Sequence, residues 1–184
     1  MTGWWKRFTE QLAGREPVPD GFEGTLEGDE RVLASASTGL GGVVLATQLG
    51  LWLPDVEVGH RRVGWHLVSK ATWRDGVLTV VESVAEEPAE DVQVLTDQAP
   101  RRYALEQPGR LPEIVHKRVT GSIQSRHHRE LPGGGAWFVQ RRIPGRTGVL
   151  LQVRPEPGTD GGAVTEVATA VAAQIRRARD ASQE

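Results

Sequence analysis

The stretch RRVGWHLVSKATWRDGVLTVVES, residues 61–83, decides the fold. Between residues 61 and 73 the apolar side chains fall on alternate positions, and most of the residues between them are polar. The apolar ones are Val63, Trp65, Leu67, Ala71 and Trp73. A repeat of two residues is typical of a strand with one buried face. The stretch therefore predicts a strand whose two tryptophans point into a core.

A two-residue turn fixes the register of this strand. Asp75-Gly76 is a favoured hairpin loop, because both positions need a positive φ. With these residues as the loop, the predicted pairs are Arg74 with Val77, Trp73 with Leu78, Thr72 with Thr79 and Ala71 with Val80. The apolar partners then share one face and the threonines the other. A shift of one residue would expose Trp73, so the two patterns predict the same hairpin.

Composition limits the classes of function. The chain has 184 residues, a mean hydropathy of -0.37, a formal charge of -2 and no cysteine. Its length fits a single soluble domain with appendages. The absence of cysteine excludes disulfides and thiolate metal sites. No apolar run approaches the roughly 20 residues of a membrane span, and the first residues lack the features of a signal peptide. A cytoplasmic protein is expected.

The rest of the chain alternates strand patterns with two helices. We expect strands over residues 31–37, 43–54, 92–96, 101–106, 125–131, 136–143 and 148–154, with an acidic loop over 86–91. A helix is predicted from Pro112 to Gln124, and its apolar face comprises Leu111, Ile114, Val115, Val119 and Ile123. A second helix is predicted over residues 163–180, with Val164, Val167, Ala168, Val171, Ala172 and Ile175 on one stripe.

The first strands resemble the opening of bacterial PH-like domains. The matching positions are Glu30 before the first strand, Thr47 at the end of the second, Leu49 to Leu53, Val63 to Trp65 and Leu78 to Val80. The resemblance implies a β-rich α+β fold, a PH-like barrel or sandwich of antiparallel strands with an inserted helix. The C-terminal helix would cap its open end. Residues 28–184 would form one such domain, and residues 1–27 an amphipathic segment and linker.

PH-like domains bind lipids or peptides or serve as scaffolds, so the fold alone does not select a function. Phosphoinositide binding in this family uses basic residues in and around the first hairpin. Residues 37–42, STGLGG, contain none. We therefore do not expect that activity.

No catalytic constellation is found in the sequence. Histidines occur at positions 60, 66, 116, 127 and 128, outside any metal-binding spacing. No G-x-S-x-G elbow is present, and the glycine-rich residues 37–42 lack the lysine of a phosphate loop. We expect no enzyme activity, no metal and no cofactor.

A basic segment, SRHHRE at residues 125–130, is a candidate anion site. Arg126, His127, His128 and Arg129 could hold a phosphate or carboxylate, with Arg141 and Arg142 on the facing strand. Alternation places Arg126 and His128 on one face and His127 and Arg129 on the other. The plainer interpretation is an edge strand kept from aggregating by its charges. Nucleic-acid binding is not expected, since the segment has no interleaved aromatics.

The N-terminus is the other candidate contact surface. Trp4, Trp5 and Phe8 lie beside Lys6 and Arg7, which is the character of a membrane-interface helix. The alternative is that these aromatics pack on the domain, on another protein or on a second copy of the chain. The sequence thus favours a non-catalytic binding or scaffolding module. A peripheral protein at the inner face of the membrane and a binder of a small anion stay open.

Overall fold

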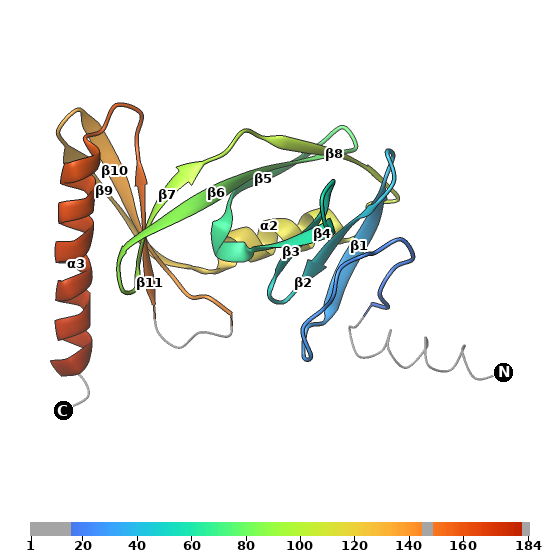
Figure 1. Cartoon of the computed structure of the whole chain (residues 1–184), viewed down its shortest axis with the longest axis horizontal. Coiled ribbons are helices and arrows are strands. Elements are labelled where there is room, and N and C mark those ends of the chain that lie inside the picture. Colours follow the sequence, from blue (N-terminus) through green and yellow to red (C-terminus); the bar gives the residue numbers. More distant parts are fainter. Residues whose placement is uncertain (1–15, 145–148, 182–184) are drawn as a thin grey trace. The chain divides into compact units, whose positions relative to one another are not determined.

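The computed structural model describes residues 16–144 and 149–181 (Figure 1). Its strands and two helices form a β-rich α+β fold, as the sequence predicts. These residues divide into two compact units, one of residues 16–82 and 99–121, the other of residues 83–98, 122–144 and 149–181. Two compact units can belong to one folding domain, so the single domain over 28–184 stays a prediction.

The first unit is an antiparallel sheet with one helix. Its elements are β1 (Val32–Thr38), β2 (Val43–Thr47), β3 (Gly50–Asp55), β4 (Gly59–Gly64), the 3₁₀ turn η1 (Trp65–Leu67), β5 (Val68–Arg74), the start of β6 (Val77–Ala89), β8 (Arg101–Glu106) and α2 (Leu111–Gly121). The strand order is β4-β3-β2-β1-β8-β6, and β5 pairs with β6. Residues 77–82 of β6 belong to this unit and the remainder to the second.

The hairpin at residues 75–76 is confirmed in every predicted pair. Arg74, Trp73, Thr72 and Ala71 lie opposite Val77, Leu78, Thr79 and Val80. Asp75 and Gly76 have φ values of 50° and 75°. Both loop residues therefore adopt the left-handed conformation that this turn requires.

The prediction that both tryptophans point inward is wrong for Trp73. Trp65 is 1% exposed and donates its indole N–H to the carbonyl of Thr47 at 3.0 Å, but Trp73 is 38% exposed. The 3₁₀ turn at Trp65–Leu67 and a register shift between Val68 and Lys70 break the alternation assumed for residues 61–73. Trp73 also lies only one residue pair from the end of the hairpin, where little chain remains to cover it.

Helix α2 closes the core of the first unit. Its buried residues Leu111, Val115 and Val119 join a cluster that includes Trp65 and Leu51. The helix packs against β1, β2 and β5. It ends at Gly121, not at Gln124, and Ile123 begins the next strand with 37% exposure. A glycine in the last turn explains the earlier end, since glycine disfavours continuation of a helix.

Residues 16–27 are not simply a linker, in contrast to expectation. Glu16 forms an isolated bridge with Val32. Phe22 and Leu26 pack against the buried side chains of Val32, Leu45 and Trp52. Part of the expected linker therefore covers one face of β1–β3. Residues 1–15, which include Trp4, Trp5, Lys6, Arg7 and Phe8, lie outside the described residues.

The second unit contains the end of β6, β7 (Val92–Asp97), β9 (Ile123–Leu131), β10 (Gly134–Arg141), β11 (Leu150–Pro155) and α3 (Gly161–Ala181). The strand order is β6-β7-β11-β10-β9, and only the β7–β11 pair is parallel. The predicted three-strand meander is confirmed. The expected acidic loop is mostly strand, because β6 continues to Ala89 and turns at Glu90 and Asp91, where Asp91 has a φ of 59°.

Helix α3 covers one face of this second sheet (Figure 1). Its predicted stripe is confirmed: Val164, Ala168 and Ala172 are buried, and Val167, Val171 and Ile175 pack beside them. Asp160 caps the helix by accepting the Ala163 N–H at 2.7 Å. The helix packs on β7 and β11 of the second unit, and its expected role as the cap of a PH-like barrel stays a prediction. The core of the first unit is covered by the other helix, α2.

The two tryptophans of the hairpin region provide a matched test of this core. We expect Trp65→Ala to lower the free energy of unfolding by about 3–5 kcal/mol, because it leaves a large cavity and an unpaired carbonyl at Thr47. Trp73→Ala should cost about 1 kcal/mol or less, as for a largely solvated side chain. Urea denaturation followed by circular dichroism measures both. Equal losses would contradict the burial described above.

Candidate functional site

The basic segment lies on β9, at the edge of the second unit's sheet. Arg126 and His128 lie opposite Val139 and Trp137, while His127 and Arg129 lie opposite Phe138 and Ala136. The first pair shares the face of Trp137, and the second pair shares the face that α3 covers further along the sheet. All four side chains are exposed. The structure thus divides the predicted site between two faces, as the alternation predicts.

The face with Trp137 carries a compact cluster, which we call the Trp137 surface: Arg126, His128, Trp137 and Glu156. The Arg126 guanidinium lies 5.5 Å from the centre of the Trp137 ring, and the His128 ring lies 5.0 Å from it. His128 Nε2 is 3.1 Å from Glu156 Oε1. Trp137 remains 39% exposed. An exposed indole beside a guanidinium and an imidazole is a contact surface suited to charged, partly apolar ligands.

Trp137 was missed by sequence reasoning, which looked for aromatics within the basic segment itself. The neighbouring strand supplies the ring. The sequence does contain a signal for this contact. If Pro132-Gly133 forms a two-residue loop, Leu131 pairs with Gly134. Three residue pairs further along the hairpin, His128 then lies opposite Trp137. The strands expected over residues 125–131 and 136–143 leave a four-residue loop between them, which hid this register, because β10 already begins at Gly134.

Gly133, Gly134 and Gly135 allow the chain before α3 to approach this hairpin closely. A Cβ on Gly135 would lie 2.6 Å from His128 Nε2 and 3.0 Å from Glu156 Oε2. Gly133 has a φ of 81°, and its Cβ would collide with the Gly158 carbonyl oxygen. The Gly135 carbonyl accepts hydrogen bonds from the Glu156 N–H and the Thr159 hydroxyl, each at 2.8 Å. The glycines therefore place Glu156 beside His128.

The arginines of β9 differ from the half-buried arginines of other strands. Arg61 donates to both carboxylate oxygens of Glu82 at 2.7 Å, and Arg154 donates to Asp97 at 3.1 Å. Within residues 16–144 and 149–181, neither Arg126 nor Arg129 has a carboxylate partner. Their charge is available to a ligand.

Arg141, which we expected on the strand facing the basic segment, is not part of this surface. It pairs with Ile123 beyond the segment and is 3% exposed. Burial and the neighbouring charge of Arg154 lower its pKa to about 10. Arg142 follows the end of β10, and its N–H donates to the Ser122 carbonyl.

Glu30, a position carrying the family resemblance, forms a buried polar network in the first unit. Glu30 Oε1 accepts from the Thr47 hydroxyl at 2.6 Å and the Trp52 indole at 2.9 Å. Glu30 Oε2 accepts from Arg62 at 2.8 Å and from the Glu27 N–H at 3.1 Å. Burial raises the pKa of Glu30, but these hydrogen bonds and the Arg62 charge outweigh it, so the pKa lies below its usual value. Four donors hold the carboxylate in a structural role.

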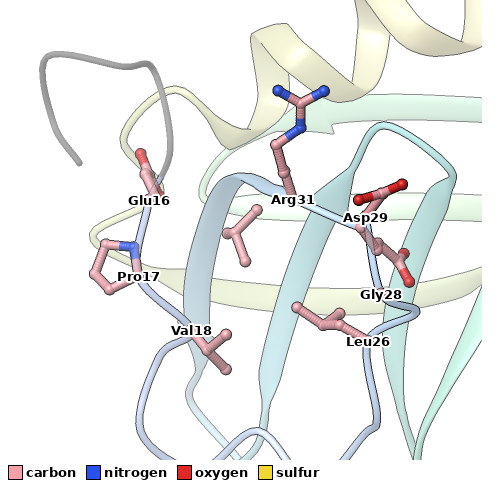
Figure 2. Close-up of a pocket in the computed structure, with 9 residues that line it drawn as sticks. Glu16, Pro17, Val18, Leu26, Gly28, Asp29 and Arg31 are labelled. Carbon is pink, nitrogen blue, oxygen red and sulfur yellow. The ribbon is translucent and has the colours of Figure 1, made fainter.

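A pocket of about 560 Å³ lies beside this network (Figure 2). Figure 2 shows it between the segment of Glu16, Pro17 and Val18 and the segment that carries Leu26 and Asp29. The residues that line this pocket do not include Arg126, His127, His128 or Arg129 of β9. Glu30 contributes to its lining, but the carboxylate is already held by Thr47 and Trp52.

His60, a histidine of the first unit, is a buried side chain bonded to the backbone. His60 is 6% exposed, and its ring nitrogens contact backbone groups of Glu23 and Val43. Across the part of the chain that the structure describes, no group of three or more His, Asp and Glu side chains is placed to hold a metal ion. In the same part of the chain, neither helix has the length and apolar character needed to cross a membrane.

Comparison of the chain with protein-family models, with curated proteins and with solved structures gave no match. The PH-like resemblance of residues 28–83 accordingly stays a prediction. Function has to be inferred from the geometry of the site.

The Glu30 network predicts a stability that depends on pH. A carboxyl group whose pKa is lowered in the folded state stabilises the fold above its unfolded pKa, and that contribution is lost as the pH falls. The usual value is 4.5. We expect Glu30→Gln to cost about 2 kcal/mol at neutral pH and to lose less of its remaining stability than the wild type between about pH 5 and pH 3.

The control for this variant is Glu57→Gln, which removes an exposed carboxylate that has no ion pair among the described residues. Its dependence of stability on pH should follow the wild type. Urea denaturation at a series of pH values measures all three proteins. The same slope in the wild type and Glu30→Gln would show that the Glu30 carboxylate is not held in its charged form.

The glycine contacts at the hairpin tip predict an unequal pair of substitutions. Gly133 and Gly41 both have positive φ values, 81° and 85°, but a Cβ on Gly41 would meet no atom within 4 Å. Gly41→Ala should cost about 1–2 kcal/mol of backbone strain. Gly133→Ala should cost clearly more, because the loop at Gly158 must also move. Thermal and urea denaturation measure the difference, and equal costs would mean that the close approach is not maintained in solution.

Proposed function

We propose that the chain is a non-catalytic binding module, and that the Trp137 surface together with β9 binds an acidic segment of a partner protein. The observation that carries this proposal is the exposed Trp137 ring with the Arg126 guanidinium 5.5 Å from its centre. Tryptophan and arginine are the residue types most often responsible for binding energy in interfaces. In this chain the Arg126 guanidinium already lies against the Trp137 ring in the absence of a partner.

The charge of the segment supports an acidic partner. Residues 125–130 contain two arginines and two histidines but a single glutamate. The chain as a whole has a net charge of -2, so this local excess of positive charge is set against a mildly acidic background. A carboxylate that approaches Arg126 or Arg129 gains a charge-assisted hydrogen bond. The contact of 3.1 Å between His128 Nε2 and Glu156 Oε1 supports a carboxylate as the group that this surface binds.

A catalytic role has less support. Among the described residues, the buried carboxylate of Glu30 is held by four donors, and the buried His60 contacts backbone groups. The groups of the Trp137 surface are exposed to water, where a reacting atom would not be shielded. Binding is therefore the function that the geometry favours. Membrane attachment through Trp4, Trp5 and Phe8 stays a prediction on residues outside those described.

An alternating Glu-Thr heptapeptide with a fluorescent label is a suitable probe. We expect it to bind the full chain, and we expect Arg126→Ala and Trp137→Ala each to weaken binding by about tenfold or more, as for residues central to an interface. Fluorescence anisotropy measures the affinities at low and high salt. Higher salt should weaken binding, because the attraction is between charges.

Two controls make this test specific. Arg102→Ala removes an exposed arginine of the interior strand β8 that has no ring contact among the described residues, and it should leave binding unchanged. A Lys-Thr heptapeptide should not bind. Equal losses for Arg102→Ala and Arg126→Ala, or no binding of the Glu-Thr peptide, would overturn the proposal. Full competition by millimolar inorganic phosphate would instead indicate a site for a small anion.

A further inference from the structure

The outer edge of β9 is open along nine residues. β9 spans Ile123–Leu131 and pairs with β10 on one side. Within the part of the chain that the structure describes, no strand pairs with its other side. An edge strand of this length presents a row of backbone donors and acceptors that another extended chain can use.

The register shows which backbone groups of β9 face outward. In an antiparallel ladder, the N–H and C=O of one residue point toward the same neighbouring strand. The Gly135 carbonyl accepts from the Glu156 N–H, so the backbone groups of Gly135 point away from β9. Its partner Glu130 therefore points outward as well. The direction of the backbone N–H and C=O groups alternates from one residue to the next. The backbone groups of Arg126, His128 and Glu130 therefore point outward, and those of His127 and Arg129 point toward β10.

From this arrangement we propose that the acidic segment binds as an added β-strand on the outer edge of β9. This inference rests on the proposed function and specifies its partner, an extended peptide with carboxylates on alternate residues. The backbone groups of Arg126, His128 and Glu130 form the new ladder. Affinity then comes from main-chain hydrogen bonds, and selectivity comes from side chains on the two faces.

β9 presents cations beside its open edge on each of its faces. Arg126 and His128 flank the open edge on the face of Trp137, and His127 and Arg129 flank it on the other face. Side chains directly opposite each other in an antiparallel pair have Cβ atoms about 4.5–5.5 Å apart. Carboxylates on alternate residues share one face of the added strand, so opposite Arg126 and His128 they reach the cations on the face of Trp137. Opposite charges across the pair favour the complex, and a basic strand is repelled.

The plainer alternative is that the charges only keep β9 from pairing with other chains. The two interpretations differ in one respect. Protection needs only the charges of β9 and requires no acidic partner. It also gives no role to Trp137, which is 39% exposed directly beside the edge. An aromatic ring there adds apolar contact that a protective edge would avoid.

N-methylation of the peptide backbone separates strand addition from contact through side chains alone. Two versions of the Glu-Thr heptapeptide are made, one methylated on every Glu nitrogen and the other on every Thr nitrogen. Only alternate N–H groups of an added strand face β9. One version should therefore lose at least tenfold in affinity for the full chain while the other binds nearly as the parent does.

Amide hydrogen exchange measured by NMR gives a second readout on the protein. Saturating parent peptide should slow exchange at the amides of Arg126, His128 and Glu130 by tenfold or more. The amides of His127 and Arg129 already face β10 and should change little. Arg102 on β8 serves as the reference, since its exchange should not respond.

The outcomes distinguish the two proposals. If the parent peptide does not bind, both fail. If it binds, but the two methylated versions bind equally or the amides of Arg126, His128 and Glu130 are not slowed, strand addition is wrong and the proposed function stands. If one methylated version binds and the other does not, and exchange slows only at the outward amides, strand addition is established.

Discussion

The constraint on which the structure depends is register, fixed by two-residue turns. In a strand, neighbouring side chains point to opposite faces, so the position of a turn decides which residues share a surface. Asp75-Gly76 sets this for the first unit and Pro132-Gly133 for the second. The second turn alone brings His128 opposite Trp137. A loop one residue longer would place Arg129, in place of His128, opposite Trp137.

The two units use charge in opposite ways. In the first, the Glu30 carboxylate is buried and surrounded by donors from Thr47, Trp52, Arg62 and the backbone of Glu27. A buried charge persists only when its hydrogen bonds are satisfied, so this group holds strands together and has no capacity left for a ligand. In the second, Arg126 is exposed and touches an aromatic ring. A charge that remains hydrated costs little to keep and can still be used for recognition.

Much of the fold follows from the sequence, and the exceptions have specific causes. The pairs of the hairpin at residues 75–76, the meander and the stripe of α3 were predicted because alternation, turn residues and helical spacing agree there. Trp73 was predicted to be buried because nothing in the sequence indicates the 3₁₀ turn at Trp65–Leu67. The packing of α3 on β7 and β11 depends on a parallel pair between strands distant in the chain, which local patterns do not specify.

The candidate site was predicted only in part, for a related reason. Arg126 and His128 are evident from their own segment, whereas the contact with Trp137 exists only across the hairpin. Glu156 is more remote still, since it reaches His128 through a loop that depends on three glycines. Site residues that belong to one strand can be recognised from that segment of the sequence alone. Residues that meet across a hairpin can be predicted only after the length of its loop is known, because the loop sets which residues pair.

The hydrogen bonds between the hairpin tip and the entry to α3 have a practical consequence for labelling the molecule. The Asp160 N–H donates to the Pro132 carbonyl at 2.9 Å, and the same Asp160 caps the helix. A dye, tag or loop insertion placed at Pro132 or Gly133 would therefore loosen the first turn of α3 as well.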